Sequence, residues 1–479
     1  MALLKQLRLF VTLGLGLACL GTQESLWAQG NRSPNVIVIL CDNLGYGDIG
    51  CFGSKLHRTP NLDQMAAEGM KFTDLYAASG VCTPSRAALL TGCYPPRVDM
   101  HKSDIGGAVL QPVSPKGLSP DEITIAELLK TKGYATTIIG KWHLGDQLPF
   151  LPTRQGFDSF YGIPYSDDMT PREGKPWPDL PLMRDEVVID APVDLNTATR
   201  LYTLEAIRFI TENRQRPFFL YLAQAMPGST RAPYASDAFR GKSENGPWGD
   251  SIEELDWSTG QILKTLDLLQ LKEQTLVIWT SDNGAPRRNP VQGSNEPLKG
   301  WGYTTAEGGM RVPTIAWWPG TVPGGTECAE VASLMDLYPT IAHLAGAELP
   351  QDRVIDGKDI LPLLKGEPGA KSPHEAFYYY MFDQLQAVRS GDWKLYLPLE
   401  NVRGGWQQEK EAFAQPRLFN LKSDLKETTD VAKQNPAVVE RMTRLAEKMQ
   451  ADLGDDENPA PGRRQAGNFP EPTARTLPQ

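Results

Sequence analysis

The stretch Asn35-Val36-Ile37-Val38-Ile39-Leu40-Cys41 is an almost unbroken apolar run that ends at the polar pair Asp42-Asn43. A run without alternation predicts a β-strand buried on both faces. Later apolar stretches have the same character and predict further strands at 135–140, 218–223, 275–280 and 314–318. Segments between these stretches have helical periodicity and predict helices at 123–132, 197–212 and 252–269. This alternation predicts an α/β fold with a large, mixed, mainly parallel sheet covered by helices on both sides.

Polar residues gather where the predicted strands end. Asp42-Asn43 follows the first strand, Lys141-Trp142-His143 the second and Asp282-Asn283 the fourth. In open α/β sheets, ligands bind outside the carboxyl ends of the strands. We therefore expect these remote segments to converge on one cleft.

The chain changes character after Pro362. Short apolar stretches between Gly and Asp turns predict antiparallel strands at 377–380, 385–390, 393–397 and 417–421, followed by a helix at 435–453. We expect a catalytic domain over 29–362 and a smaller C-terminal sheet-plus-helix domain over 363–454. The remainder, 455–479, is rich in Pro, Gly and charge, which predicts a disordered tail.

The first 28 residues have the pattern of a signal peptide. Lys5 and Arg8 precede a short apolar core over 9–20, and a cut after Ala28 would release the mature chain. The core is short for a membrane anchor. Leu17-Ala18-Cys19 leaves lipoprotein anchoring at Cys19 as an alternative to export into the periplasm or medium. No other stretch is long and apolar enough to predict a transmembrane span.

The net charge of −10 argues against nucleic acid as the main partner. An anionic substrate would have to be attracted by local cations. After removal of the signal, five cysteines remain, too few for a disulfide scaffold: Cys41, Cys51, Cys82, Cys93 and Cys328. Cys51 and Cys93 flank the most informative segment and are candidates for a pair, although sequence alone does not define connectivity.

That segment runs from Val81 to Gly92 and has the form Cys-x-Pro-Ser-Arg, then an Ala/Leu stretch and a closing Gly. The plain interpretation is a Cys before a helix that starts with Pro. The motif also resembles the signature of the type I sulfatases, in which a formylglycine-generating enzyme oxidises the cysteine, here Cys82, to formylglycine.

Sulfate ester cleavage needs a nucleophile, cations for the sulfuryl oxygens and a proton for the leaving alcohol. A thiol serves poorly, whereas one hydroxyl of an aldehyde hydrate can attack sulfur and the other can later expel sulfate. Pro84 and Ser85 would begin a helix whose free N–H groups face the anion. Arg86, one turn further on, is expected to hold the nucleophile oxygen.

The remaining polar residues suggest further roles. Asp42, Asn43, Asp282 and Asn283 offer hard oxygen donors, which suit Ca²⁺ or Mg²⁺, with the modified Cys82 side chain as a further ligand. Each Asp-Asn pair alone is also typical of an exposed turn. We expect Lys141 to contact a sulfate oxygen and His143 to be the base for sulfate release.

The resemblance to sulfatases extends from about Pro34 to Leu453. Its other landmarks are 42–48, 140–145, 162–165, 253–257, 282–284 and 307–313. Those at 162–165 and 253–257 look most like the branch containing arylsulfatase A and N-acetylgalactosamine-6-sulfatase. The family implies an alkaline-phosphatase-like fold, a calcium ion and a small four-stranded C-terminal domain.

Three positions depart from the family pattern. Asn43 stands where the family usually has Asp, Gly228 where it has the His that commonly protonates the leaving group, and Gly302 where it has Lys. Lys299 and Arg231 are candidates to replace the lost cations at the substrate.

The expected function is hydrolysis of sulfate esters on sulfated carbohydrate by an exported enzyme. One alternative is a phosphoester hydrolase on the same fold, which Cys82 disfavours because such relatives typically have Ser or Thr there. Another is a catalytically degraded protein that binds sulfated glycans, which Gly228 and Gly302 favour.

Overall fold

The computed structural model describes residues 33–404, 414–455 and 458–478. Its centre is β1 (Asn35–Asp42), which lies between β9 (Phe218–Pro227) and β10 (Thr275–Ser281) and runs parallel to both. All eight residues of β1 are buried. The strand buried on both faces that the sequence predicts is therefore confirmed.

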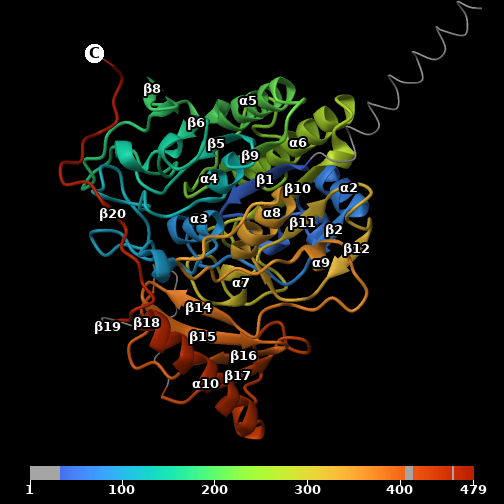
Figure 1. Ribbon diagram of the computed structural model, residues 1–479, viewed down its shortest axis with the longest axis vertical. Helices are drawn as coiled ribbons and strands as arrows, with labels where there is room; N and C mark the ends of the chain where they lie inside the picture. Colours follow the sequence, from blue (N-terminus) through green and yellow to red (C-terminus); the bar gives the residue numbers. More distant parts are fainter. Residues whose placement is uncertain (1–32, 405–413, 456–457, 479) are drawn as a thin grey trace, which may run out of the picture.

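The described residues form a ten-stranded sheet (Figure 1). Five neighbouring pairs are parallel: β12–β2, β10–β1, β1–β9, β9–β5 and β5–β6. The other four pairs are antiparallel: β2–β11, β11–β10, β6–β7 and β7–β8. The strand order is β12 (Thr326–Cys328), β2 (Met70–Phe72), β11 (Thr314–Trp317), β10, β1, β9, β5 (Ala135–Lys141), β6 (Ser159–Ile163), β7 (Leu182–Arg184) and β8 (Val187–Asp190). The expected α/β fold with a mixed, mainly parallel sheet is confirmed.

The register brings the carboxyl ends of the central strands to one edge. Leu40 of β1 pairs with Thr280 of β10 and with Ala223 of β9, and Gly140 of β5 pairs with the same Ala223. The segments that follow these strands therefore begin side by side, as parallel pairing requires.

Successive residues of β1 point to opposite faces of the sheet, and each face has its own core. Val36, Val38 and Leu40 pack with one set of helices, α3 (Cys82–Thr91), α4 (Ile125–Lys130), α8 (Leu337–Ala345) and α9 (Leu361–Leu364). Ile37 and Ile39 pack with the other set, α2 (Pro60–Glu68), α5 (Ala198–Glu212) and α6 (Gly246–Leu268).

This division between two cores separates the cysteines. Cys93 is buried in the core on the α3 side, and Cys51 packs against the core on the α6 side. The suggested Cys51–Cys93 pair is therefore wrong, because the sheet lies between the two thiols. Every cysteine in the described residues is free.

The C-terminal unit is a four-stranded antiparallel sheet covered by one helix (Figure 1). Its elements are β14 (Phe377–Met381), β15 (Gln384–Ser390), β16 (Trp393–Tyr396), β17 (Arg417–Asn420) and α10 (Pro436–Leu453). Met442, Leu445 and Ala446 of α10 pack in the same core as Tyr76 and Met310 of the larger unit. The smaller antiparallel sheet expected from the sequence is confirmed.

Buried charges also join the two units. The Lys394 ammonium of β16 lies 2.9 Å from the carboxylate of Glu307, the first residue of α7 (Glu307–Met310). It also lies 3.2 Å from the Glu427 carboxylate, and all three side chains are completely buried.

The prediction of disorder after Asp455 is wrong for residues 458–478. β20 (Gly467–Asn468) pairs with β4 (Lys116–Gly117), and Arg464 donates hydrogen bonds of 2.7 and 3.0 Å to the buried Glu122 carboxylate. The last stretch thus lies along the larger unit (Figure 1), where specific partners offset its unfavourable composition. Shorter strands pair as β3 (Leu75–Tyr76) with β13 (Ala332–Ser333) and β18 (Gly454–Asp455) with β19 (Asn458–Pro459).

The proposed signal peptide and Cys19 lie outside the described residues. Within the described ranges, no helix combines the length and the apolar character that crossing a bilayer demands.

Candidate active site

Three remote segments meet at the carboxyl edge of the sheet. One ligand atom from each of Asp42, Cys82 and Asp282 lies within 4.8 Å of the others, and all three residues are buried. Asp42 ends β1, Asp282 follows β10 and Cys82 begins α3. The arrangement follows from the sheet, because parallel strands place their ends together and α3 packs across that edge.

Arg86 connects the two carboxylates. Its Nε and Nη2 atoms donate to Asp282 Oδ2 at 3.0 and 2.8 Å, and Nη2 also donates to Asp42 Oδ1 at 2.9 Å. Its Nη1 atom donates to the backbone carbonyl of Lys141 at 2.8 Å. The Arg86 guanidinium, which we expected to hold the nucleophile oxygen, is thus bound to the Asp42 and Asp282 carboxylates, and Arg86 positions these two side chains.

Lys141 supplies a second buried cation. Its ammonium lies 2.7 Å from Asp42 Oδ1 and 3.1 Å from the Ser166 hydroxyl. Burial disfavours ionisation of Asp42, but the charges of Lys141 and Arg86 outweigh it and hold the pKa of Asp42 well below its usual range. Burial, reinforced by the Asp42 charge, raises the pKa of Asp282 to about 7.

The two asparagines complete a set of oxygen donors. Asn43 adopts a left-handed backbone (φ 61°), which Asn tolerates better than most residues. Its Oδ1 atom accepts from Asn283 Nδ2 at 2.7 Å and lies 3.9 Å from the Cys82 sulfur. Asn283 Oδ1 is buried without a partner in the described residues. Carboxylate and amide oxygens around an unsatisfied acceptor fit a hard divalent cation.

His143 is held as a neutral imidazole. Its Nε2 atom lies 3.0 Å from the Leu110 carbonyl, which only accepts, so the proton is on Nε2 and the lone pair is on Nδ1. Nδ1 has no hydrogen-bond partner within the described ranges. Burial, followed by the Lys141 charge, lowers the pKa of His143 well below its ordinary value. The ring can therefore accept a proton.

Cys82 occupies the N-terminal end of α3. The preceding residue, Val81, provides no side-chain cap, so the first N–H groups are available to an anion. Burial and the Asp42 charge raise the pKa of the Cys82 thiol well above its ordinary value. An unmodified Cys82 would thus remain a protonated thiol, which is a weak nucleophile.

Cys82 lines a cavity of about 320 Å³. His143 lines it, together with residues that the sequence did not single out. These are Val81, Gly107, Ala108, Val109, Gln111, Ser166, Asp168, Met169, Arg172, Lys175, Trp177, Ser229 and Tyr303.

Asp167 was also missed, although it follows the landmark at 162–165. Its Oδ1 atom accepts from the Ser229 backbone N–H at 2.9 Å and from the Ser166 hydroxyl at 3.2 Å, and Oδ2 accepts from the Thr230 N–H at 3.0 Å. A Cβ atom at Gly228 would lie 2.7 Å from Asp167 Oδ2, and Gly228 has φ 77°. Asp167 therefore takes the space where the family usually has its His.

The other missing family residue is explained in the same way. A Cβ atom at Gly302 would lie 2.1 Å from the Gly284 carbonyl oxygen, so the close backbone packing leaves no room for Lys.

The structure does not bring the two suggested replacement cations into the cavity. The Lys299 ammonium donates to the Glu427 carbonyl at 3.3 Å and lies 5.6 Å from the centre of the Phe419 ring, in the C-terminal unit. Arg231 is exposed and does not line the cavity. Arg288, which we did not predict, donates to the Gly228 carbonyl at 3.1 Å.

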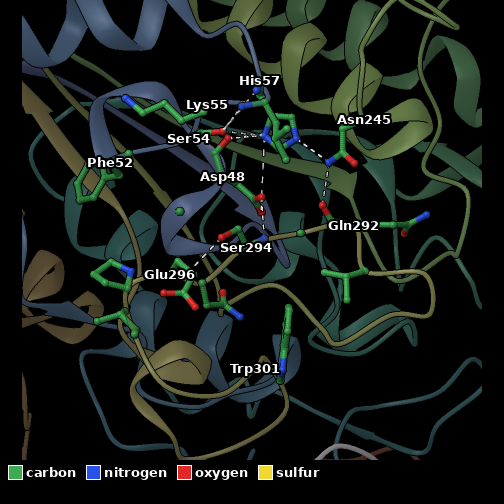
Figure 2. A pocket seen from close by; sticks show the side chains of 18 of the residues that line it. Asp48, Phe52, Ser54, Lys55, His57, Asn245, Gln292, Ser294, Glu296 and Trp301 are labelled. Carbon is green, nitrogen blue, oxygen red and sulfur yellow. Dashed lines mark hydrogen bonds and ion pairs between the residues drawn. The ribbon is translucent and has the colours of Figure 1, made fainter. Parts of the chain in front are cut away.

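A larger cavity of about 720 Å³ lies on the flank of the loop 291–301 (Figure 2), and none of the predicted site residues lines it. The Asp48 carboxylate there accepts from the N–H groups of Gly45 at 2.8 Å and Ser294 at 2.9 Å. His57 Nδ1 lies 2.6 Å from the Asp48 carbonyl. These contacts (Figure 2) join the segment 48–57 to the loop 291–301.

Comparison with known proteins agrees with this geometry. The family model "Sulfatase" matches residues 34–347, and "C-terminal region of aryl-sulfatase" matches residues 372–468. N-acetylgalactosamine-6-sulfatase of Canis lupus familiaris is 39% identical over 83% of this chain and 81% of its own. Steryl-sulfatase of Mus musculus is 39% identical over 76% of this chain and 71% of its own.

A solved structure is similar as well. The PsFucS1 sulfatase from Pseudoalteromonas sp. superimposes with a TM-score of 0.77 at 30% identity, over 89% of this chain and 92% of that one. The site and fold are those of a hydrolase of sulfuric esters. The chain belongs to the sulfatase family.

Proposed function

We propose that this sulfatase is exported and removes sulfate from sulfated carbohydrate, using a formylglycine made from Cys82 together with a bound Ca²⁺ or Mg²⁺. The observation that carries the proposal is the position of Cys82: it begins a helix, lies beside two buried carboxylates and lines the cavity. Sugar is our choice of substrate because the N-acetylgalactosamine-6-sulfatase relatives align over more of the chain than the steryl-sulfatases.

The reaction proceeds through the hydrate of formylglycine. One hydroxyl loses its proton, its oxygen attacks the sulfur, and the bond from sulfur to the substrate oxygen breaks as that oxygen takes up a proton. Loss of the proton from the second hydroxyl then reforms the aldehyde and expels sulfate. Water restores the hydrate.

The chain's own residues provide the electrostatics. The free N–H groups at the start of α3 would stabilise the transferred sulfuryl group, and the Lys141 ammonium supplies a buried positive charge beside Asp42. Arg86 holds the Asp42 and Asp282 carboxyl groups in place and helps to keep Asp42 ionised. Asp42, Asn43, Asp282 and Asn283 would hold the cation, which when bound supplies positive charge and lowers the pKa of the adjacent hydrate.

Two groups manage protons. His143 Nδ1 accepts the proton of the second hydroxyl during release of sulfate. Asp167 replaces the missing His as the proton source for the leaving alcohol. When protonated, it donates its proton to the Ser166 oxygen 3.2 Å away, and Ser166, which lines the cavity, passes its own hydroxyl proton to the leaving oxygen. Burial raises the pKa of Asp167 to about 7, so a large fraction is protonated at neutral pH.

The test combines chemistry and mass. Protein made in a host with the maturation enzyme should contain formylglycine in the Cys82 peptide by mass spectrometry and should release sulfate from a sulfated hexosamine. The variant Cys82→Ala should bind the same sugar and release none. N-terminal sequencing of the exported protein should begin at Gln29.

Two results would favour the alternatives. Complete modification with binding of sulfated sugar but no sulfate release would indicate a degraded binding protein, as the losses at Gly228 and Gly302 suggest. Faster cleavage of a phosphate ester than of the matched sulfate ester would indicate a phosphoester hydrolase.

A further inference from the structure

Three side chains from the segment 172–177 line the same cavity as Cys82. The Arg172 guanidinium lies 5.0 Å and the Lys175 ammonium 5.1 Å from the centre of the Trp177 ring. At these distances the ring face attracts a cation. We call Arg172, Lys175 and Trp177 the cationic rim.

The backbone of the cationic rim is fixed. Lys175 N–H donates to the Arg172 carbonyl at 2.9 Å, and Arg172 N–H donates to the Lys175 carbonyl at 3.2 Å. This two-way pairing closes a tight turn through Gly174, which has φ 72°. Both cations are therefore presented on the same short turn beside Trp177.

The charges of the cationic rim are only partly neutralised. The nearest carboxylate oxygen of Asp168 lies 3.9 Å from Arg172 Nη2, beyond hydrogen-bond distance. Within the described ranges, Lys175 has no ion pair closer than 4.0 Å. A chain with a net charge of −10 thus places two positive side chains in the lining of its reactive cavity. Such a placement attracts an anion locally, against the field of the whole molecule.

The deep cations cannot serve a second anion. Arg86 is completely buried and paired with Asp42 and Asp282, Lys141 is completely buried and paired with Asp42, and neither cation lines the cavity. A substrate whose sulfate ester lies over Cys82 presents its remaining substituents to the rest of the cavity lining, which includes the cationic rim.

We infer that the cationic rim binds a second anionic group of the substrate, a carboxylate or a further sulfate on the same or the adjacent sugar. The inference rests on the proposed function and narrows it to sulfated carbohydrates with at least two negative charges. The Arg172 fork suits either oxyanion, and Lys175 adds a point charge.

The test compares three substrates: a monosulfated hexosamine, the corresponding disulfated hexosamine and a monosulfated hexosamine joined to a uronic acid. The double variant Arg172→Ala/Lys175→Ala should lower kcat/KM about tenfold for the two dianionic substrates, as two half-exposed ion pairs would. For the monosulfated sugar, kcat/KM should change less than twofold. The dianionic substrate whose kcat/KM falls more identifies the second anionic group as a sulfate or a carboxylate.

A matched control removes the same charge elsewhere. Lys132 and Arg214 are exposed and do not line the cavity, so Lys132→Ala/Arg214→Ala should leave all three kcat/KM values unchanged. The charge-retaining variant Arg172→Lys/Lys175→Arg should recover most of the loss. Equal losses on all three substrates, or none on the dianionic pair, would overturn the inference.

A binding measurement separates this inference from the proposed function. In the Cys82→Ala background, calorimetry should show that the disulfated sugar binds about tenfold more weakly when Arg172 and Lys175 are also replaced by Ala. If the wild type releases no sulfate but this tenfold difference in binding is observed, the proposed function is rejected and the role of the cationic rim stands. Unchanged binding would reject the cationic rim.

Discussion

The Asp167 carboxyl is almost completely buried, and burial together with the charges of Asp42 and Asp168 raises its pKa to about 7. If it supplies the proton to the leaving alcohol, Asp167→Asn should lower kcat for an alkyl sulfate about 100-fold. Cleavage of 4-nitrophenyl sulfate, whose leaving group needs no proton, should change little. Because the protonated form is the active one, kcat for the alkyl sulfate should fall as pH rises above about 7.

The neighbouring Asp168 offers a matched control, since it lines the cavity but takes no part in the contacts with Ser166 and Ser229. Asp168→Asn should not change the dependence of rate on the leaving group. A uniform loss on both substrates in Asp167→Asn would mean that the carboxyl only anchors the turn at 228–230.

The residues of the candidate site differ in how visible they are from the sequence. Asp42, Lys141 and Asp282 follow buried strands, so strand periodicity alone predicts their meeting at one edge. Ser166 and Ser229 belong to loops and have no pattern that distinguishes them from surface serines. Their neighbours depend on how those loops fold back, which no local periodicity encodes.

At the scale of elements, the short strand β20 stabilises a loop of the site. Beyond β20, the Thr473 N–H donates to Gln147 Oε1 at 2.9 Å, and Arg475 Nε donates to the Asp146 carbonyl at 2.7 Å. These contacts lie three and four residues after His143. Removal of residues 466–479 should lower kcat severalfold by loosening that loop, measured on 4-nitrophenyl sulfate.

The single variant Arg475→Ala serves as the comparison for this truncation, because it loses one contact and keeps the pairing of β20 with β4. Its kcat should lie between those of the wild type and the truncated chain. A truncated chain with full activity would show that the last residues do not support the site. The composition of residues 466–479 does not predict these contacts, because the partner residues lie more than 300 positions earlier in the sequence.

For the whole molecule, the triad of Lys394, Glu307 and Glu427 joins the two units. Burial favours neutral Glu307, but Lys394, Arg389 and Arg311 outweigh it and hold its pKa at about 2. Lys394→Met would leave two buried carboxylates without their shared cation and should cost roughly 3–5 kcal/mol of unfolding free energy. Denaturant titration measures this cost, with the exposed Lys422→Met as a control of near-zero effect.

The pH dependence that Glu307 contributes has a definite sign, whereas burial raises the pKa of Glu427 in the same triad. The pKa of Glu307 is lower in the folded chain than its ordinary value of 4.5. Its contribution is thus complete above pH 4.5 and is lost as pH falls towards 2. The wild type should lose stability over this window, and Lys394→Met should lose less. If the free energy of unfolding fell by the same amount between pH 4.5 and pH 2 in both proteins, the role given to the Glu307–Lys394 pair would be contradicted.

The burial of α3 has a consequence for the order of events in the cell. Cys82 is 3% exposed and Arg86 is 0% exposed, so a modifying enzyme cannot grip this segment once the helix has docked on the sheet. If Cys82 is converted to formylglycine as proposed, we expect the conversion to take place on the nascent or still extended polypeptide. Chains that fold before conversion would keep an unreactive thiol at Cys82. The active fraction of a preparation would then depend on the rate of conversion relative to the rate of folding.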